Sequence, residues 1–221
     1  DKILDWEVRN SNRYYINSLN QDFLFNFKDG GILRDNQSNL FKSYINKMLR
    51  SKIDLIITSG AVSAGKYDFV PSIVNNFKLS SYFKGVAIRP GKPILFAKIK
   101  GNSKAIFGLP GNPISSSACF RFFVYPYLRS LLGISDENSF KAKLKNQFIK
   151  KKNFTRFVKS KLSTTKDGKL EVVILKGQES FRIKSFIQSN VWVMLPAGKS
   201  KFRKGEVVDC FFPNHSNKVI L

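Results

Sequence analysis

The sequence predicts an α/β protein in which a three-layer αβα domain with a mostly parallel sheet is followed by a small β-barrel domain. Up to about Leu132, short apolar runs alternate with helix-like runs, as is typical of parallel strands covered by helices on both faces. From Lys141 onward the pattern changes to short alternating strands. We therefore expect one domain over residues 1–138 and a second over residues 139–221.

The N-terminal elements follow from hydrophobic spacing. Residues 11–19 and 38–49 have helical periodicity, and Ser38 is a suitable cap for the second helix. Residues 23–27 predict a strand between these helices. Residues 53–57 form a short apolar run rich in β-branched side chains, which predicts a strand buried on both faces.

A glycine-containing loop over residues 58–68 leads from that strand to a helix expected over residues 69–77. Pro71 suits an early position in this helix. Asp68 ends the loop, where a helix cap and a ligand contact are equally compatible with the sequence. The loop supplies glycines for close ligand approach and hydroxyls for hydrogen bonds: Ser59, Gly60, Ser63 and Gly65.

A second loop over residues 108–115 repeats this design. It follows the apolar run 105–107 and precedes a helix expected over residues 115–132. Its prolines stiffen the turn, and Asn112 or Ser115 can cap the helix while facing a ligand. Because parallel strands end at the same edge of a sheet, the two loops are expected to form one crevice for an anionic ligand.

A third turn, within residues 84–93, precedes a strand expected over residues 94–97. Arg89 and Lys92 are separated by Pro90-Gly91, so the cations stand on a stiff turn. Both side chains suit phosphate or another oxyanion.

The C-terminal part predicts a small barrel or sandwich. Strands are expected over residues 154–162, 170–175, 191–195 and 207–212. Residues 164–168, with the sequence Thr-Thr-Lys-Asp-Gly, predict a hairpin turn between the first two strands.

The formal net charge is +23, which favours anionic ligands and would also attract nucleic acid. The lysine-rich run over residues 141–152 lacks an aromatic stacking motif, and we expect a solvated connecting segment there rather than a nucleic-acid site. No apolar run reaches membrane-spanning length and no secretory leader is visible, so we expect a cytoplasmic protein without membrane contact.

Cysteine and histidine usage limits the chemistry. Cys119 and Cys210 lie in apolar surroundings without CxxC spacing, and we expect two buried free thiols. His215 is the only histidine, which argues against a histidine-based metal site or a catalytic triad.

Several ordered motifs together resemble the catalytic half of the molybdopterin molybdenumtransferases, the bacterial MoeA and eukaryotic gephyrin family. The resemblance covers most of the chain, including its C-terminal β-domain. The motifs are Ser11-Asn12-Arg13 and residues 31–36, 58–68, 89–93, 108–115, 156, 178–180, 195–198 and 204–208.

The resemblance implies an enzyme that takes adenylylated molybdopterin and molybdate as substrates, releases AMP and leaves molybdenum on the dithiolene. It implies Asp35 and Asp68 as catalytic carboxylates, and two carboxylates near a pyrophosphate imply a magnesium ion between them. It also implies a homodimer. The implied substrate-binding residues are Asn12, Ser59, Gly60, Ser63, Gly65, Arg89, Pro90, Gly91, Lys92, Pro93, Pro110, Gly111, Asn112, Pro113, Ser115, Arg156 and Ser180.

The chain departs from the family pattern at four positions. Ala61 stands where a second glycine is usual, and Lys66 where an acidic residue is common. Arg89 replaces a frequent lysine, and Glu179 replaces a usual glycine beside Ser180. Family chains are also considerably longer, so we expect a fragment whose isolated activity is low.

Three other functions are compatible with parts of the sequence. A molybdopterin adenylyltransferase would share the α/β domain, although such enzymes usually lack the C-terminal β-domain. A non-catalytic binding or scaffold module would show no metal-dependent turnover. A nucleic-acid binder would show steeply salt-sensitive, sequence-tolerant binding.

Overall fold

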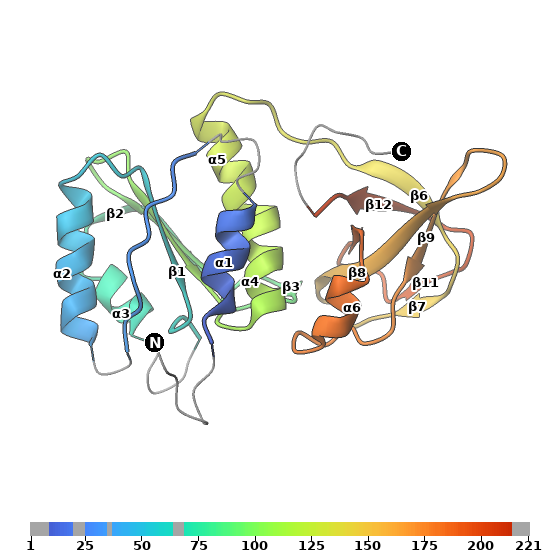
Figure 1. Ribbon diagram of the computed structural model, residues 1–221, viewed down its shortest axis with the longest axis horizontal. Coiled ribbons are helices and arrows are strands. Elements are labelled where there is room, and N and C mark those ends of the chain that lie inside the picture. The colour runs from blue at the N-terminus through green and yellow to red at the C-terminus, as the bar shows by residue number, and fades with distance from the viewer. Residues whose placement is uncertain (1–8, 20–24, 35–36, 64–68, 214–221) are drawn as a thin grey trace.

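The computed structural model describes residues 9–19, 25–34, 37–63 and 69–213, and every statement below concerns these residues (Figure 1). Helices and a small sheet form the N-terminal part, and a separate barrel forms the C-terminal part. In this part of the chain, no helix combines the length and the apolar character needed to cross a membrane. The division at residue 138 stays a prediction.

The first sheet has the strand order β1-β5-β4-β2, formed by Leu55–Ser59, Ala105–Leu109, Leu95–Ile99 and Leu79–Lys84. β1 and β5 are parallel, whereas β5 and β4, and β4 and β2, are antiparallel. The prediction of a mostly parallel sheet is therefore confirmed only for β1 and β5. Residues 100–104 join β4 to β5 as a short turn, and so short a connection permits only antiparallel pairing.

Helices α2 (Ser38–Leu49) and α3 (Val70–Val74) cover one face of this sheet. Their apolar side chains share a core with alternate residues of the strands. In β1 and β5 these residues are Ile56 and Ile106, which point to the same face. Both predicted helices are confirmed, although α3 is shorter than expected.

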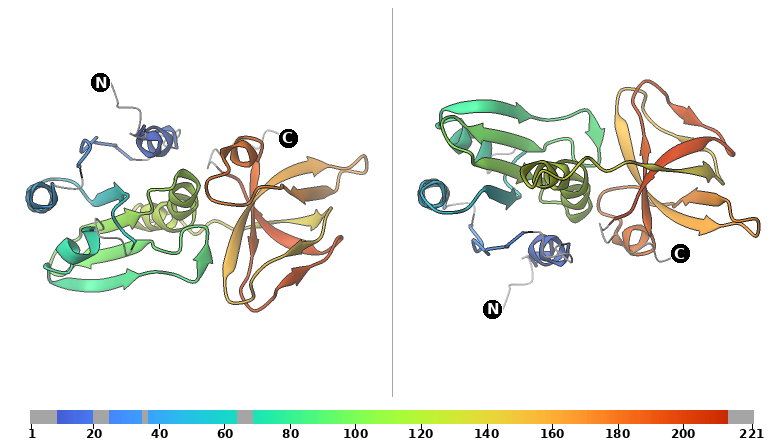
Figure 2. Two further views of the ribbon diagram at one scale, coloured as in Figure 1. Left: turned by 90° about the horizontal axis from the view of Figure 1, so that it is seen from below. Right: turned by 90° about the horizontal axis from the view of Figure 1, so that it is seen from above.

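The opposite face carries α1 (Ser11–Ser18) and a long helical segment (Figure 2). That segment comprises α4 (Pro113–Cys119), the π-helical turn η1 (Phe120–Val124) and α5 (Tyr125–Leu131), close to the predicted 115–132. The π-helical turn lies just before Pro126, which has no N–H to donate to the preceding turn and therefore interrupts the regular α-helical hydrogen bonds there. Sheet and helices thus form three layers.

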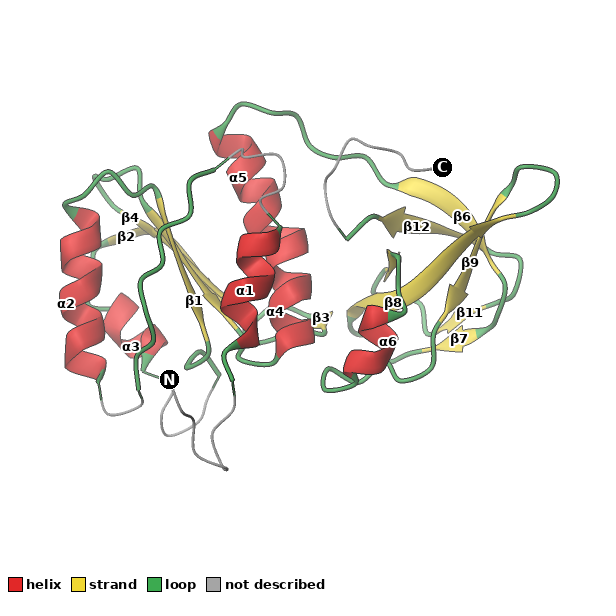
Figure 3. Ribbon diagram, viewed as in Figure 1, coloured by secondary structure: helices red, strands yellow, loops and turns green. Residues whose placement is uncertain are grey.

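Five strands close the barrel: β6 (Phe140–Leu144), β8 (Thr155–Thr164), β9 (Leu170–Ile174), β10 (Val191–Leu195) and β12 (Val207–Phe211). Their order is β10-β12-β6-β9-β8, and the pairing of β10 with β8 completes the circle. Figure 3 labels β6, β8, β9 and β12 of this barrel. The antiparallel β8–β9 pair confirms the predicted hairpin. Inward side chains fill the barrel: Ala142, Leu144, Val158, Val172, Ile174, Val191, Val193, Leu195, Phe202, Val208 and Cys210.

The prediction of a solvated connecting segment over residues 141–152 is wrong. β6 lies in this run, with Ala142 and Leu144 buried in the barrel and the alternating lysines Lys141, Lys143 and Lys145 exposed. Short strand β7 (Phe148–Ile149) follows and pairs with β11 (Lys201–Phe202). Lys150 is buried. The alternation of lysine with apolar residues was a strand signal that the high charge obscured.

Two further differences concern short elements. Residues 25–27 do not form the predicted strand, whereas residues 23 and 24 lie outside the described residues. β2 was not predicted, because only some of its side chains are partly buried and the rest are exposed. The two cysteines are buried and free, as predicted, and burial raises the pKa of Cys210 to about 12.

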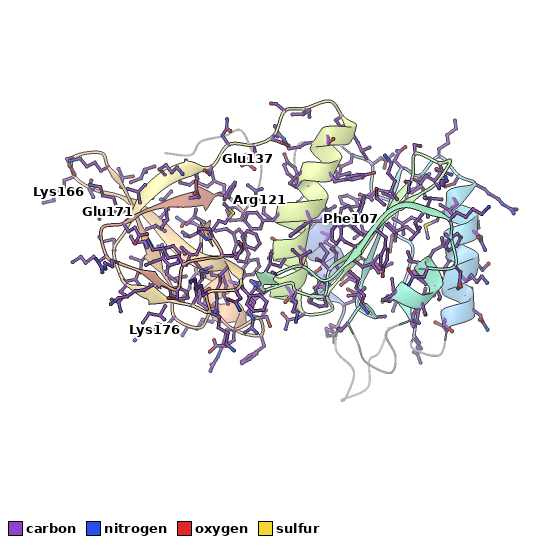
Figure 4. All side chains as sticks on the ribbon, turned by 180° about the vertical axis from the view of Figure 1, so that it is seen from behind. Phe107, Arg121, Glu137, Lys166, Glu171 and Lys176 are labelled. Atoms are coloured by element: carbon purple, nitrogen blue, oxygen red, sulfur yellow. The ribbon has the colours of Figure 1, made fainter. Side chains whose placement is uncertain are left out.

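An aromatic contact joins the barrel to the helices. The side chains of Phe157 and Trp192 lie on the outer side of the barrel. They belong to the same hydrophobic core as residues of α4 and α5. The rings of Phe122 and Phe157 stack at a centroid distance of 3.8 Å and an interplanar angle of 9°. Next to them, Arg121 and Glu137 pair where the helices meet the barrel (Figure 4).

Candidate functional site

The loops that follow β1 and β5 meet at one edge of the first sheet. Ser59 and Leu109 are paired in register at the ends of these parallel strands. The amide of Gly60 donates to the carbonyl of Leu109 at 2.9 Å. A Cβ on Gly111 would stand 3.5 Å from the Cα of Gly60, so the loops are in direct contact. This convergence is what two parallel strands with loops at the same edge require.

Asn12 of α1 connects the two loops. Its side chain is buried, and Nδ2 donates to the hydroxyl of Ser59 at 2.5 Å and to the carbonyl of Gly111 at 2.9 Å. Both protons of the amide are thus used to fix the loops. Asn12 acts here as an organiser of the edge, and direct contact with a ligand stays a prediction.

The turn from Arg89 to Pro93 packs against α4. The Arg89–Pro90 peptide bond is cis, and Gly91 has a φ of +102°. A Cβ at Gly91 would stand 2.4 Å from Sγ of Cys119 and 3.5 Å from the carbonyl oxygen of Ser115. Only glycine fits this position, both for its backbone conformation and for the contact. The third predicted turn therefore lies beside the start of α4.

Buried oxygen atoms without partners gather near the first two loops. Asn112 precedes α4 but its side chain forms no cap, and its Oδ1 is buried without a hydrogen-bond partner among the described residues. Oγ1 of Thr58 and Oγ of Ser116 are in the same situation. A buried oxygen without a partner is costly, so such atoms are expected to meet water or a ligand.

Arginines from both parts of the chain meet beside this edge. Strand β3 (Ile88–Arg89) extends the barrel by pairing in parallel with β8, and Arg89 stands in register with Arg156. The guanidinium of Arg89 lies 4.8 Å from the ring centroid of Phe154, and Nζ of Lys92 lies 6.0 Å from it. Among the described residues, no carboxylate forms an ion pair with these three cations.

The unpaired charges act on one another. Burial lowers the pKa of Arg156, the charge of Arg89 lowers it further, and the carboxylate of Glu179 acts in the opposite direction. The pKa of buried Lys150 is also lowered, by burial and then by Arg156. Nζ of Lys150 donates to the carbonyl of Phe154 at 2.7 Å. A site with this excess of positive charge is suited to a small dianion.

The turn that carries Ser180 runs from β9 to α6 (Ile183–Ile187). Glu179 is exposed, and its carboxylate lies 3.9 Å from Nε of Arg182. Ser180 is partly buried. Its position beside Glu179, whose charge acts on Arg156, links this turn to the arginine pair.

Three predicted site residues, Asp35, Gly65 and Asp68, lie outside the described residues, as does Lys66. Ser63 is described and exposed at the end of the first loop. Within the described ranges, no group of three or more histidine, cysteine, aspartate or glutamate side chains is arranged to hold a metal ion.

Sequence reasoning missed three residues of this region: Lys150, Phe154 and Lys159. Phe154 was regarded only as the start of a strand, although it stands two residues before Arg156. Lys159 is almost fully buried, and its alternation with Phe157 placed it on a covered face of β8. That alternation was the available signal.

The fold combines an α/β domain, in which two loops meet at one edge of the sheet, with a closed five-stranded barrel. The chain belongs to the family described as "Probable molybdopterin binding domain", whose model matches residues 1–130. Residues 141–211 match the MoeA C-terminal region, described as domain IV. The predicted family is thereby confirmed.

Curated relatives carry the same assignment. The chain is 32% identical over 212 residues to a molybdopterin molybdenumtransferase of Staphylococcus epidermidis, which covers 95% of this chain and 49% of the relative. It is 33% identical over 213 residues to the Staphylococcus aureus protein of that name, with the same coverage. The chain thus spans about half the length of the curated relatives it matches.

Solved structures agree on the fold. A molybdenum cofactor biosynthesis protein from Pyrococcus furiosus superposes with a TM-score of 0.68 at 25% identity, covering 91% of this chain and 64% of that protein. The molybdopterin biosynthesis MoeA protein from Pyrococcus horikoshii superposes with a TM-score of 0.71 at 23% identity, covering 93% of this chain and 47% of that protein.

Proposed function

We propose that this chain is the molybdenum-inserting half of a molybdopterin molybdenumtransferase in molybdenum cofactor biosynthesis. The substrates are adenylylated molybdopterin and molybdate. The observation that carries the proposal is the meeting of three turns beside Arg89 and Arg156. The names of the relatives support it, because 95% of this chain matches proteins named for this reaction.

In this proposal the loops after β1 and β5 hold the phosphate groups of the nucleotide-linked pterin. Their backbone amides, glycines and hydroxyls permit close approach of an anion. Asn12 keeps the loops in register through its bonds to Ser59 and Gly111. The residues assigned to this contact are Ser59, Gly60, Gly65, Pro110, Gly111, Asn112 and Pro113.

The molybdate contact is assigned to the neighbouring cations and hydroxyls and to the proline that follows Lys92. These residues are Ser63, Arg89, Lys92, Pro93, Ser115, Arg156 and Ser180. Charge-assisted hydrogen bonds from arginine and lysine neutralise the dianion and orient it toward the dithiolene sulfurs. The same charges stabilise the negative charge that develops on the pterin phosphate when water cleaves the phosphoanhydride bond and AMP leaves.

Magnesium, held by Asp35 and Asp68, belongs to the proposal. A bound magnesium ion would supply charge neutralisation between the two carboxylates and a phosphate oxygen. Both aspartates lie outside the described residues. A homodimer, which rests on the family resemblance, and a cytoplasmic location complete the proposal.

The test is molybdate-dependent release of AMP from adenylylated molybdopterin by the full-length protein. We expect Arg156→Met to lower the rate by at least about tenfold, since it removes a charge-assisted contact to the dianion. Lys161→Met is the matched control, because Lys161 is an exposed lysine on the same strand. Absence of AMP release by the wild-type protein would overturn the proposal.

A further inference from the structure

Lys159 is a buried lysine whose ammonium is fully used by backbone carbonyls. The residue is 1% exposed. Its Nζ donates to the carbonyls of Gly177 at 2.7 Å, Glu179 at 3.0 Å and Arg182 at 3.2 Å. An ammonium group has three protons, so three carbonyls satisfy it completely. Among the described residues, no carboxylate forms an ion pair with it.

These carbonyls belong to the turn that carries Ser180. In a trans peptide unit the C=O and N–H bonds point in opposite directions. Because the carbonyl of Glu179 points to Lys159, the N–H of Ser180 in the same peptide unit points away from it. Within the described residues, neither this N–H nor the hydroxyl of Ser180 has a hydrogen-bond partner.

Gln178 and Ser185 fix the same turn from two sides. The side-chain oxygen of Gln178 accepts a hydrogen bond from the backbone amide of Lys159 at 3.0 Å. Its Nε2 donates to the backbone carbonyl of Lys159 at 2.7 Å. The hydroxyl of Ser185 donates to the carbonyl of Gly177 at 2.6 Å. The turn is therefore anchored on β8 through the ammonium of Lys159 and through Gln178, and the amide of Arg182 closes it by donating to the carbonyl of Glu179 at 3.1 Å.

The turn also lies close to the arginine pair. Arg156 stands three residues before Lys159 on β8, the strand to which the carbonyl of Glu179 is bonded. The carboxylate of Glu179 also acts electrostatically on both cations. Donors of Ser180 that point away from Lys159 are thus available to a dianion bound near Arg156.

We propose that Lys159 is a positioning residue that directs the N–H and hydroxyl of Ser180 to the bound oxyanion. The inference rests on the proposed function, since it deepens the molybdate site. It assigns the Ser180 amide as a donor in addition to its hydroxyl. Lys159 itself does not touch the oxyanion, because its three protons are occupied.

The experiment compares the full-length wild-type protein with Lys159→Met and with the control Lys161→Met. Molybdate binding is measured by calorimetry, and amide hydrogen exchange is measured over residues 177–182. We expect Lys159→Met to weaken binding by about tenfold or more and to accelerate exchange in the turn. Lys161→Met should leave both unchanged.

A comparison of the pH profiles of the wild-type protein and Lys159→Met separates positioning from simple packing. Burial lowers the pKa of Lys159 to about 8, with Glu179 opposing the shift and Arg156 adding to it. Above this pH the neutral amine has one proton too few for three carbonyls. We therefore expect molybdate affinity to fall between about pH 7 and pH 9.5, and to fall less in Lys159→Met.

Equal affinity of wild-type protein and Lys159→Met, or the same pH profile in both, would overturn the inference. If Lys159→Met does not fold, a wild-type affinity that is constant over this pH range would overturn it equally. If the wild-type protein binds no molybdate, the proposed function fails. Unchanged amide hydrogen exchange over residues 177–182 in Lys159→Met would instead show that Lys159 does not order the turn, and would overturn the inference alone.

Discussion

Arg89 and Arg156 stand opposite each other in adjacent parallel strands, one from the helical part and one from the barrel. Two like charges in neighbouring positions repel each other, and the pKa of Arg156 is lowered by burial and then by the charge of Arg89. A dianion between them would relieve the repulsion. The pairing is the strongest electrostatic reason for an oxyanion at this place.

Phe154 is expected to hold the cations in position. Its ring lies under Arg89 and within reach of Lys92, and such contacts contribute about 0.5–2 kcal/mol each. We predict that Phe154→Leu weakens molybdate binding by about threefold to tenfold in a calorimetric titration. Tyr14→Leu is the control, because the guanidinium of Arg13 lies 4.9 Å from the ring centroid of Tyr14, which is exposed. Equal affinities for both variants would contradict this role.

Glu179 is expected to oppose anion binding. Its carboxylate acts on Arg156 and Lys159, and thereby offsets positive charge that a dianion would use. We predict that Glu179→Gln raises molybdate affinity by a few-fold at low salt, and that the gain shrinks as salt screens the charges. Glu171→Gln serves as the control, since Glu171 pairs with Lys145 on the barrel. A loss of affinity in Glu179→Gln would refute the prediction.

Ala61 has a φ of +54°, in the left-handed region that favours glycine. We predict that Ala61→Gly stabilises the protein by about 0.5–1 kcal/mol in urea unfolding, because it removes backbone strain that exceeds the entropic cost of glycine. Ala118→Gly in α4 is the contrasting variant. It should destabilise the protein by about 1 kcal/mol or more, since Ala118 is helical and buried. Destabilisation by Ala61→Gly would contradict this reading of the loop.

Arg121 is expected to fix the barrel to the helices. Its guanidinium bonds both carboxylate oxygens of Glu137, at 2.9 and 2.6 Å, and the carbonyl of Phe212 at 2.7 Å. Burial lowers the pKa of Arg121, and the charge of Glu137 opposes that shift. We predict that Glu137→Gln destabilises the protein by about 2–4 kcal/mol, because it leaves a buried charge unpaired.

The matched comparison is Lys145→Met, which breaks a more exposed ion pair with Glu171 and should cost less than about 1 kcal/mol. Urea unfolding of both variants measures the difference. Equal losses would indicate that the Arg121 pair contributes no more than a surface pair.

Local signals were sufficient where structure depends on neighbouring residues in the sequence. The loop before α4 was predicted because Pro113 and Asn112 mark a helix start next to an apolar run. The contact of this loop with Gly60 followed from one assumption, that β1 and β5 are parallel neighbours. Both statements needed only short-range chemistry and one rule of sheet geometry.

Long-range pairing was beyond the same reasoning. β3 has two residues and exists because β8 lies beside it, so nothing within residues 88–89 marks a strand. Lys159 has the composition of a surface residue, and its burial depends on carbonyls some 20 positions further along the chain. β6 was missed for a different reason, since its lysines outweighed a valid alternation of apolar residues.

The pairing of β3 with β8 has a consequence for recombination between relatives. A barrel taken from another member would have to accept the incoming β3 and present a residue compatible with Arg89 opposite it. Exchange of the barrel alone would therefore separate β3 from the β8 strand with which it pairs, and Arg89 from Arg156. We expect chimeras joined in the linker before β6 to need the 88–89 segment and its β8 counterpart from the same parent.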